Sequence, residues 1–586
     1  MRYIHFVIFS LLLLVGCAQT PTLQTASEPA AEPLPAPVAD AAPAAPVEEL
    51  RVTPQRPFPD DSLYDLLVAE FALRRREYDQ ALQNYTELAP QLRDTAVSAR
   101  ATRLAQFMRD EESAITAARL WAELDPDQME AHLMLANMLA RRGQTLEALP
   151  HMIALTRAGG AANYSALATG FEQLGNGQKQ KLLDTINQLR LEQPQDTQLM
   201  ICKALLLENL GQTPAAIDEL QAVFAIDTQQ LQAIVLEAKL KQDMKQYDGL
   251  YDRITAALEA NPDNSLLRMQ YARLLTRTDL SEARTQFSYL LERAPDDSNL
   301  LLSVALIEME LGNIAEAKPH LEALLRQNTR TDEAHLYLGR IAEQEQRFDD
   351  ALLHYKNITP AGDFGFATGR IAALALAAGK DQELRFYLAQ LRQQYPRLRE
   401  QLYAIEIDSL SSTNRTREAL QAANVALLEL PDSSDLQYMR SMLYEAQGNL
   451  SAMERDMRLI LERDPDNATV LNALGYTLAD RTDRLAEAEI MITRALQMQP
   501  DEPAVIDSMG WVKYRLGEIE EALTYLQRAY ELFPDPEVAA HYGEVLWVSG
   551  DQEQALEIWR AALLVKPGHS LVLETMRRLG APVVAE

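Results

Sequence analysis

A pattern that returns about every 34 residues limits the fold of this chain more than any other feature of its sequence. Near the C-terminal end, prolines recur at intervals of 34, 35, 34 and 33 residues, at Pro431, Pro465, Pro500, Pro534 and Pro567. Each interval holds two amphipathic runs whose apolar positions follow helical spacing. Because neither run can bury its apolar face alone, consecutive units must stack into an extended array.

Small residues keep step with these prolines. One unit carries Gly510, Gly517, Ala522 and Ala529, and the next unit has the same residue types 33 positions later, at Gly543, Gly550, Ala555 and Ala562. We expect the first glycine and the alanines to let two helices pack closely, and the second glycine to end a helix in a left-handed cap. The sequence therefore predicts an all-α fold, a right-handed superhelical solenoid of about 15 helix hairpins.

The spacing resembles the tetratricopeptide repeat (TPR), over roughly residues 60–567. It departs from that motif at the position where a tryptophan is usual, because Leu471 and Ile506 stand there. The resemblance implies that defined positions of the first helix in each unit line a concave surface that binds protein segments. The residues predicted to bind protein on this concave face are Tyr438, Tyr476, Asp507, Trp511, Tyr514 and Trp547.

Two interpretations of these six residues stay open at this level. Aromatic side chains with polar neighbours are typical of protein interfaces. Large inner-face side chains can equally fill a tightly wound superhelix by packing against one another. The other two tryptophans, Trp121 and Trp559, fall at core positions of the second helix of their units.

The sequence gives no indication of an active site. It contains no H-E-x-x-H zinc motif, no G-x-S-x-G elbow and no phosphate-binding loop. With Cys17 and Cys202 as its two cysteines, no C-x-x-C pair exists. No catalytic residue, metal ion or cofactor is therefore expected. The net charge of −30 also argues against nucleic acid as a partner, because a phosphate surface would repel the chain.

The N-terminus predicts a lipoprotein. Residues 1–16 read as a signal peptide, and "LVGC" resembles a bacterial lipobox that ends in a lipidated Cys17. Residues 17–58 are rich in Ala, Pro and Glu and predict a disordered tether. Beyond them we predict an N-terminal TPR block at 59–360, a C-terminal TPR block at 361–567, and a capping helix with a tail at 568–586.

The whole-chain architecture resembles the TPR outer-membrane lipoproteins of Gram-negative bacteria that act as adaptors. It is most similar to the long TPR lipoprotein that partners a periplasmic carboxyl-terminal processing protease, a likeness that also rests on "LYDLLVAEFALRRREYDQALQNYTEL". This resemblance implies a non-enzymatic scaffold, anchored in the outer membrane and facing the periplasm. It would bind that serine protease and present substrates such as peptidoglycan hydrolases.

Two alternatives remain from the sequence. One is a TPR lipoprotein assembly factor for an envelope machine, such as a pilus or secretin, or for the export of outer-membrane protein or polysaccharide. The other is an enzyme that acts on the cell wall itself, which the missing motifs disfavour.

Overall fold

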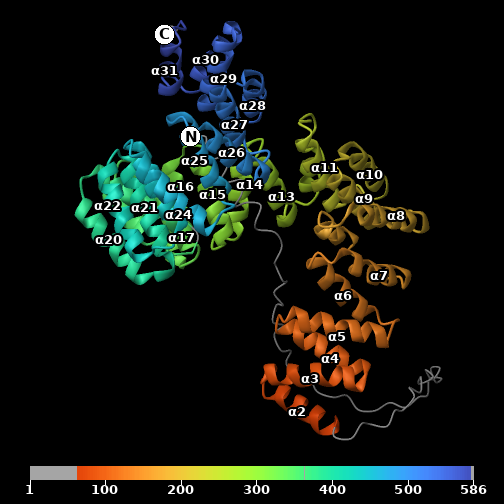
Figure 1. Cartoon of the computed structure of the whole chain (residues 1–586). Helices are drawn as coiled ribbons and strands as arrows, with labels where there is room; N and C mark the ends of the chain where they lie inside the picture. The colour runs from red at the N-terminus through yellow and green to blue at the C-terminus, as the bar shows by residue number, and fades with distance from the viewer. Residues whose placement is uncertain (1–61, 362, 583–586) are drawn as a thin grey trace, which may run out of the picture. The chain divides into compact units, whose positions relative to one another are not determined.

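The structure, a computed structural model, describes residues 62–361 and 363–582, and over these residues it consists of helices and their connections, with no strand (Figure 1). Cys17, the predicted signal peptide and the predicted tether lie outside the described residues. Within the described part, no helix has the length and apolar character needed to cross a membrane.

The chain forms two compact units that divide between Ala317 and Lys318, inside α16 (Ile314–Gln327). The other helices of the first unit are α2 (Ser62–Arg74), α3 (Tyr78–Leu92), α4 (Thr95–Phe107), α5 (Glu111–Leu124), α6 (Met129–Arg141), α7 (Thr145–Arg157), η1 (Tyr164–Gly170), α8 (Asn176–Glu192), α9 (Thr197–Asn209), α10 (Thr213–Ile226), α11 (Leu231–Asp243), α12 (Asp252–Ala260), α13 (Ser265–Leu275), α14 (Leu280–Arg293) and α15 (Ser298–Glu310).

The second unit continues in the same manner. Its helices are α17 (Thr331–Gln344), α18 (Phe348–Lys356), α19 (Phe364–Ala377), α20 (Asp381–Gln394), η2 (Pro396–Leu398), α21 (Arg399–Ser412), α22 (Thr416–Glu429), α23 (Ser434–Ala446), α24 (Leu450–Arg463), α25 (Ala468–Arg481), α26 (Leu485–Met498), α27 (Pro503–Leu516), α28 (Ile519–Leu532), α29 (Pro536–Ser549), α30 (Gln552–Val565) and α31 (Ser570–Arg578).

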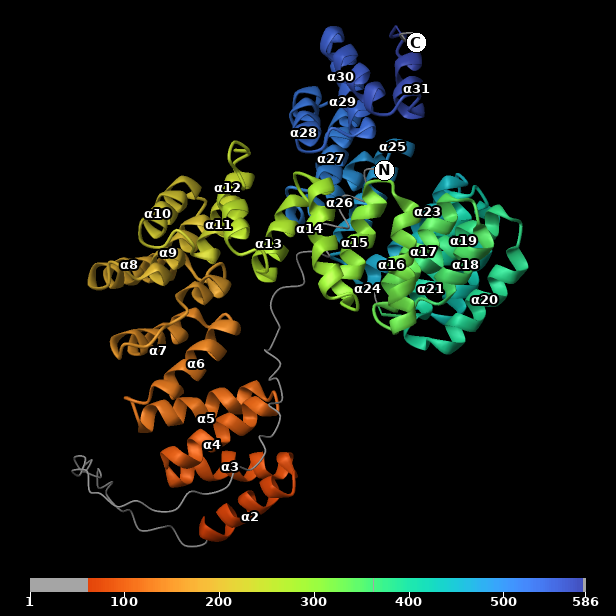
Figure 2. The ribbon, with the colours of Figure 1, turned by 180° about the vertical axis from the view of Figure 1, so that it is seen from behind.

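The helices pair in chain order into hairpins. With η1 as the first helix of the fourth pair, α2 to α30 make fifteen hairpins among the described residues, which confirms the predicted all-α fold and number of units. In both views α2 to α7 follow one another as stacked layers (Figures 1 and 2). The last helix, α31, packs on α29 and α30, and its role as a capping helix stays a prediction.

A glycine and a tryptophan explain how closely the two helices of the last hairpin pack. A Cβ on Gly543 would lie 2.3 Å from the Nε1 atom of Trp559, so only glycine lets the second helix approach with its indole in place. Trp559 is fully buried, and Trp121 is buried in its own unit, as predicted. Gly550 ends α29 in the left-handed conformation with a φ of 105°, which also confirms the predicted cap.

The fourth hairpin is irregular, because a 3-10 segment replaces its first α-helix. This segment ends at Gly170, and a Cβ there would lie 2.1 Å from the backbone oxygen of Gly143. The third and fourth hairpins therefore meet backbone to backbone at this point. No small-residue signal in the predicted repeat singled out this contact.

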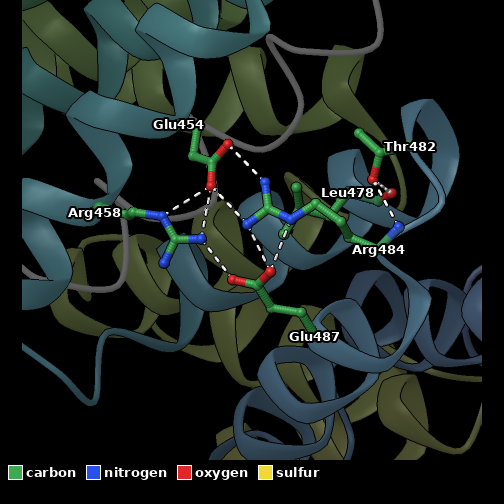
Figure 3. A network of polar contacts seen from close by, with 6 residues as sticks. All are labelled: Glu454, Arg458, Leu478, Thr482, Arg484 and Glu487. Atoms are coloured by element: carbon green, nitrogen blue, oxygen red, sulfur yellow. Dashed lines mark hydrogen bonds and ion pairs between the residues drawn. The ribbon is translucent and has the colours of Figure 1, made fainter.

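Ion pairs at the spacing of the repeat join successive hairpins on their exposed surface. The partners lie 27 to 33 residues apart and include Arg103–Glu130, Arg141–Glu111, Arg385–Glu418, Arg494–Asp466 and Arg528–Asp501. Figure 3 shows a network of such ion pairs, in which Arg458 and Arg484 each contact both Glu454 and Glu487. Exposed pairs of this kind contribute little to stability individually, typically about 0–1 kcal/mol.

The predicted boundary between two TPR blocks at residue 360 falls in the connection between α18 and α19. These two helices pack on each other, and residue 362 in their connection lies outside the described residues. The assignment of residues 59–360 and 361–567 to separate blocks stays a prediction.

Candidate functional site

A hollow of about 660 Å³ lies where the first halves of α25, α27 and α29 and the start of α31 converge; we call it the inner hollow. These are the first helices of three successive hairpins and the capping helix, so the hollow belongs to the face that the repeat pattern predicts to be concave. Its described lining is Asn472, Ala473, Tyr476, Glu502, Pro503, Ala504, Asp507, Ser508, Phe533, Asp535, Glu537, Val538, His541, Lys566, His569 and Leu571.

The local sequence explains why acidic groups gather at this place. Glu502 and Asp535 are the N-cap residues of α27 and α29, and each is followed by a proline that begins the helix. The Asp535 carboxylate accepts the backbone N–H of Glu537 at 2.8 Å. Since both helices start at the hollow, their caps place carboxylates along its rim.

A buried polar cluster forms the wall of the hollow. The Nδ1–H of His541 donates to Oδ2 of Asp507 at 2.8 Å, and its Nε2 lies 3.1 Å from the hydroxyl of Tyr476. On its face, the imidazole stacks against Trp511 with ring centroids 4.4 Å apart. The cluster thus joins three successive hairpins through α25, α27 and α29.

The electrostatics of His541 follow from this burial. Burial alone would lower its pKa, but the charge of Asp507 and its hydrogen bond outweigh burial, and Glu544 and Asp480 add to them. The pKa of His541 is therefore raised above its ordinary value. An imidazolium paired with a carboxylate inside a protein is stabilising only because both partners are present.

Two acceptors of the cluster remain without donors. Within residues 62–361 and 363–582, the Oδ1 atom of Asp507 and the Oδ1 atom of Asn472 are buried and have no hydrogen-bond partner. Both residues line the inner hollow. A buried acceptor without a hydrogen-bond donor lowers stability by about 1–3 kcal/mol. A bound group that donates hydrogen bonds to two such acceptors would remove this cost.

The structure places the six predicted residues on first helices of the last hairpins, at α23, α25, α27 and α29. Trp511 is only 6% exposed and Asp507 only 7% exposed, because His541 of the next hairpin covers the first and pairs with the second. For these two residues the structure follows the alternative, in which inner-face side chains pack against one another. Whether any of the six binds a partner stays a prediction.

The other four predicted residues are half-buried, and of these four only Tyr476 shares the inner hollow with Asp507. Tyr476 lines the inner hollow, whereas the hydroxyl of Tyr514 donates to Glu544 at 3.3 Å. Trp547 packs on Trp559 with centroids 5.8 Å apart. Tyr438, like Tyr476 and Tyr514, packs against the core cluster that contains Trp511.

Sequence reasoning missed His541, which organises the site. A partial signal was present, because His541 follows Asp507 by 34 residues, one position past Ala540, which is the equivalent place in the next repeat. In a stacked array, residues one period apart on the first helices are neighbours.

Among the described residues, no group of three or more His, Cys, Asp and Glu side chains is arranged to hold a metal ion. The arrangement offers hydrogen-bond acceptors and half-buried aromatic rings. It therefore suits recognition of a polar group.

Matches to family models agree with this fold. Models of the tetratricopeptide repeat match residues 302–365, 434–467 and 508–568. Over 98 residues, 17% of this chain and 10% of the relative, the chain is 31% identical to bacteriophage adsorption protein A of Escherichia coli. Among solved structures, a complex of Cut9 and Hcn1 from the APC/C is similar at 13% identity and a TM-score of 0.32, covering 89% of this chain and 96% of that one.

One relative extends over most of the chain. The TPR repeat-containing protein PA4667 of Pseudomonas aeruginosa is 37% identical over 488 residues, which cover 83% of this chain and 82% of that protein. The shared length includes far more than the segments that the repeat models match. Together with the fifteen hairpins, it shows that this chain belongs to the TPR repeat-containing proteins.

Proposed function

We propose that this chain is a membrane-anchored adaptor without enzymatic activity of its own. It binds a periplasmic carboxyl-terminal processing serine protease and presents protein substrates to it, among them peptidoglycan hydrolases. TPR repeat-containing proteins are interaction scaffolds, and that general role is the firm basis of the proposal. The choice of protease follows from the resemblance of the whole chain to the adaptor lipoproteins.

The inner hollow is the observation that carries the scaffold role. It combines buried acceptors without donors, half-buried aromatic side chains and an acidic rim on the face that successive hairpins share. A long array also provides room for two partners at once. When both are held on one scaffold, their encounter becomes intramolecular, and the effective concentration rises.

Anchoring is the second part of the proposal. Cys17 lies outside the described residues, and its lipidation would hold the array at the outer membrane on the periplasmic side. Several acyl chains on one residue anchor stably, whereas a single chain is marginal. A Cys17→Ser variant is expected to leave the membrane fraction while it keeps the helical content of the parent.

A pull-down from detergent-solubilised envelopes tests the function. We expect the tagged full chain to recover a serine protease and at least one wall hydrolase, and to accelerate cleavage of the hydrolase when the purified components are mixed. Recovery of a secretin, a pilin or an export component in their place would support the assembly-factor alternative. Digestion of peptidoglycan by the chain alone would contradict the absence of enzymatic activity.

A further inference from the structure

The inner hollow contains a carboxylate oxygen that nothing in the described chain satisfies. Asp507 is more than nine-tenths buried, and its Oδ2 accepts a hydrogen bond from the Nδ1–H of His541 while its Oδ1 has no donor among the described residues. Asn472 on the adjacent α25 offers a second such acceptor on the wall of the same hollow. Two acceptors without donors, on residues that line the same hollow, favour an occupant with several N–H donors.

The charged residues around the inner hollow indicate what kind of donor would bind there. Asp535, Glu502 and Glu537 stand on the rim, and Lys566 is the one lysine in the described lining. Glu502 and Glu537 are exposed and Asp535 is half-buried, so their field extends into the opening. The N-terminal end of α29 would favour an anion, but the Asp535 carboxylate already caps it, and the exposed carboxylate of Glu502 stands at the start of α27 without a capping hydrogen bond. An anionic ligand would also face the unpaired oxygen of Asp507.

The apolar part of the lining adds a shape requirement. Phe533, Val538 and Leu571 stand beside the polar groups, and Tyr476 presents its ring to the same space. A lysine or arginine side chain matches this combination, because its alkyl stem covers apolar surface while its charged end makes hydrogen bonds. The volume of about 660 Å³ exceeds what a small ion needs and leaves room for flanking peptide backbone.

We propose that the inner hollow binds a lysine or arginine side chain of an extended peptide, with the charged end directed to Asp507 and Asn472. This inference rests on the proposed scaffold function and deepens it by naming the chemistry of the bound segment. It gives the acidic rim a role in selecting partners, since segments rich in Asp or Glu would be repelled.

Fluorescence anisotropy with short peptides tests this. The probes are peptides capped at both ends, with alanine and serine flanks, that carry a central lysine, arginine, acetyl-lysine, norleucine or glutamate. We expect the full chain in detergent to bind the lysine and arginine peptides at least about tenfold more tightly than the other three. An uncapped peptide with norleucine at the centre tests whether a free N-terminal amine binds equally well, which would contradict the side-chain assignment.

The rim supplies a variant that should keep its fold. Glu502→Gln with Glu537→Gln removes two exposed charges, and we expect it to reduce the preference for lysine severalfold. Glu553→Gln with Glu557→Gln changes the net charge equally, on exposed positions of α30 outside the lining, and should leave the preference unchanged. Asp507→Asn should abolish the preference, with circular dichroism reporting whether the fold is retained.

The results separate this inference from the proposed function. Equal affinity for lysine and acetyl-lysine peptides, absence of binding by every peptide, or an identical response of the two double variants would overturn the cation assignment even if the protease is captured. A lysine preference that depends on Glu502 and Glu537, in a chain that captures no protease, would keep the site and reject the choice of protease.

Discussion

The indole of Trp511 on α27 stacks on the imidazole of His541 on α29, with ring centroids 4.4 Å apart and an angle of 29° between the planes. The two residues come from consecutive hairpins, so their contact is part of what holds one repeat on the next. It also places an aromatic residue, predicted to bind a partner, inside the interface between hairpins.

Trp511→Ala should therefore destabilise the second unit. Removal of a buried aromatic side chain leaves a cavity and costs about 3–5 kcal/mol. Trp547→Ala should cost less, because Trp547 is only half-buried. Thermal unfolding followed by circular dichroism measures both. If both variants lost equally little stability, that result would contradict a structural role for Trp511 between the hairpins and would favour its role in binding a partner.

The His541–Asp507 pair predicts a pH dependence of its own. Because the folded pKa of His541 is raised, its protonated form contributes stability that is full below its unfolded pKa of about 6.5 and fades as the pH rises through the folded value. Asp507→Asn should cost about 1.5–3 kcal/mol near pH 6. The difference from the parent should narrow near pH 9 in urea unfolding, and a constant difference would contradict the pairing.

Two histidine pairs predict the opposite trend. The Nδ1 atoms of His132 and His151 lie 2.8 Å apart, and burial, followed by the charges of His132 and Arg119, lowers the pKa of His151 to about 4. The pair of His335 and His354 repeats this geometry at 3.0 Å, and burial is the largest factor that lowers the pKa of each.

The stability that these neutral histidines contribute to the fold is complete above about pH 6.5. It is lost as the pH falls toward the lowered pKa values of the folded protein, because the unfolded chain takes up protons first. After allowance for solvent screening, we expect the lowered pKa of His151 to cost about 1–3 kcal/mol between pH 7 and pH 4.5, and the pair of His335 and His354 to lose stability in the same direction. His151→Gln and His354→Gln should each flatten the acid side of the unfolding profile. A profile identical to that of the parent would contradict the lowered pKa values of His151 and His354.

The contact of Gly170 with Gly143 predicts a sharp effect of one methyl group. Gly170→Ala would place its Cβ 2.1 Å from a backbone oxygen that no rotamer change can move, and we expect a loss of about 3 kcal/mol. Gly177→Ala is the matched control, since a Cβ there meets nothing within 4 Å in the described chain. It should be neutral or stabilising by up to about 1 kcal/mol in the same denaturation experiment.

The network of Figure 3 predicts a modest effect that depends on salt. The side chain of Arg484 is 42% exposed and contacts both Glu454 and Glu487. Arg484→Gln should lower stability by less than about 1 kcal/mol at low salt, with the loss shrinking in about 1 M NaCl. Arg494→Gln, which removes the pair with Asp466, should have a smaller effect. Losses that do not respond to salt would point to packing in place of charge.

Sequence alone predicted the elements of this protein well. The period of the prolines and glycines determined fifteen hairpins, because each landmark has a local cause. Gly543 is required where Trp559 approaches, and Gly550 is required where the chain turns with positive φ. The burial of Trp121 and Trp559 also followed from their place within one helix pair.

The inner face was decided by tertiary structure. The sequence places Trp511 and Asp507 on the first helix of their hairpin, but their exposure depends on how closely the next hairpin stacks. That distance is set by many small contacts between hairpins, and it brings His541 over both residues. Periodicity thus determines which residues share a face, while only the packing of successive hairpins determines which of them are buried and which acceptors remain without donors.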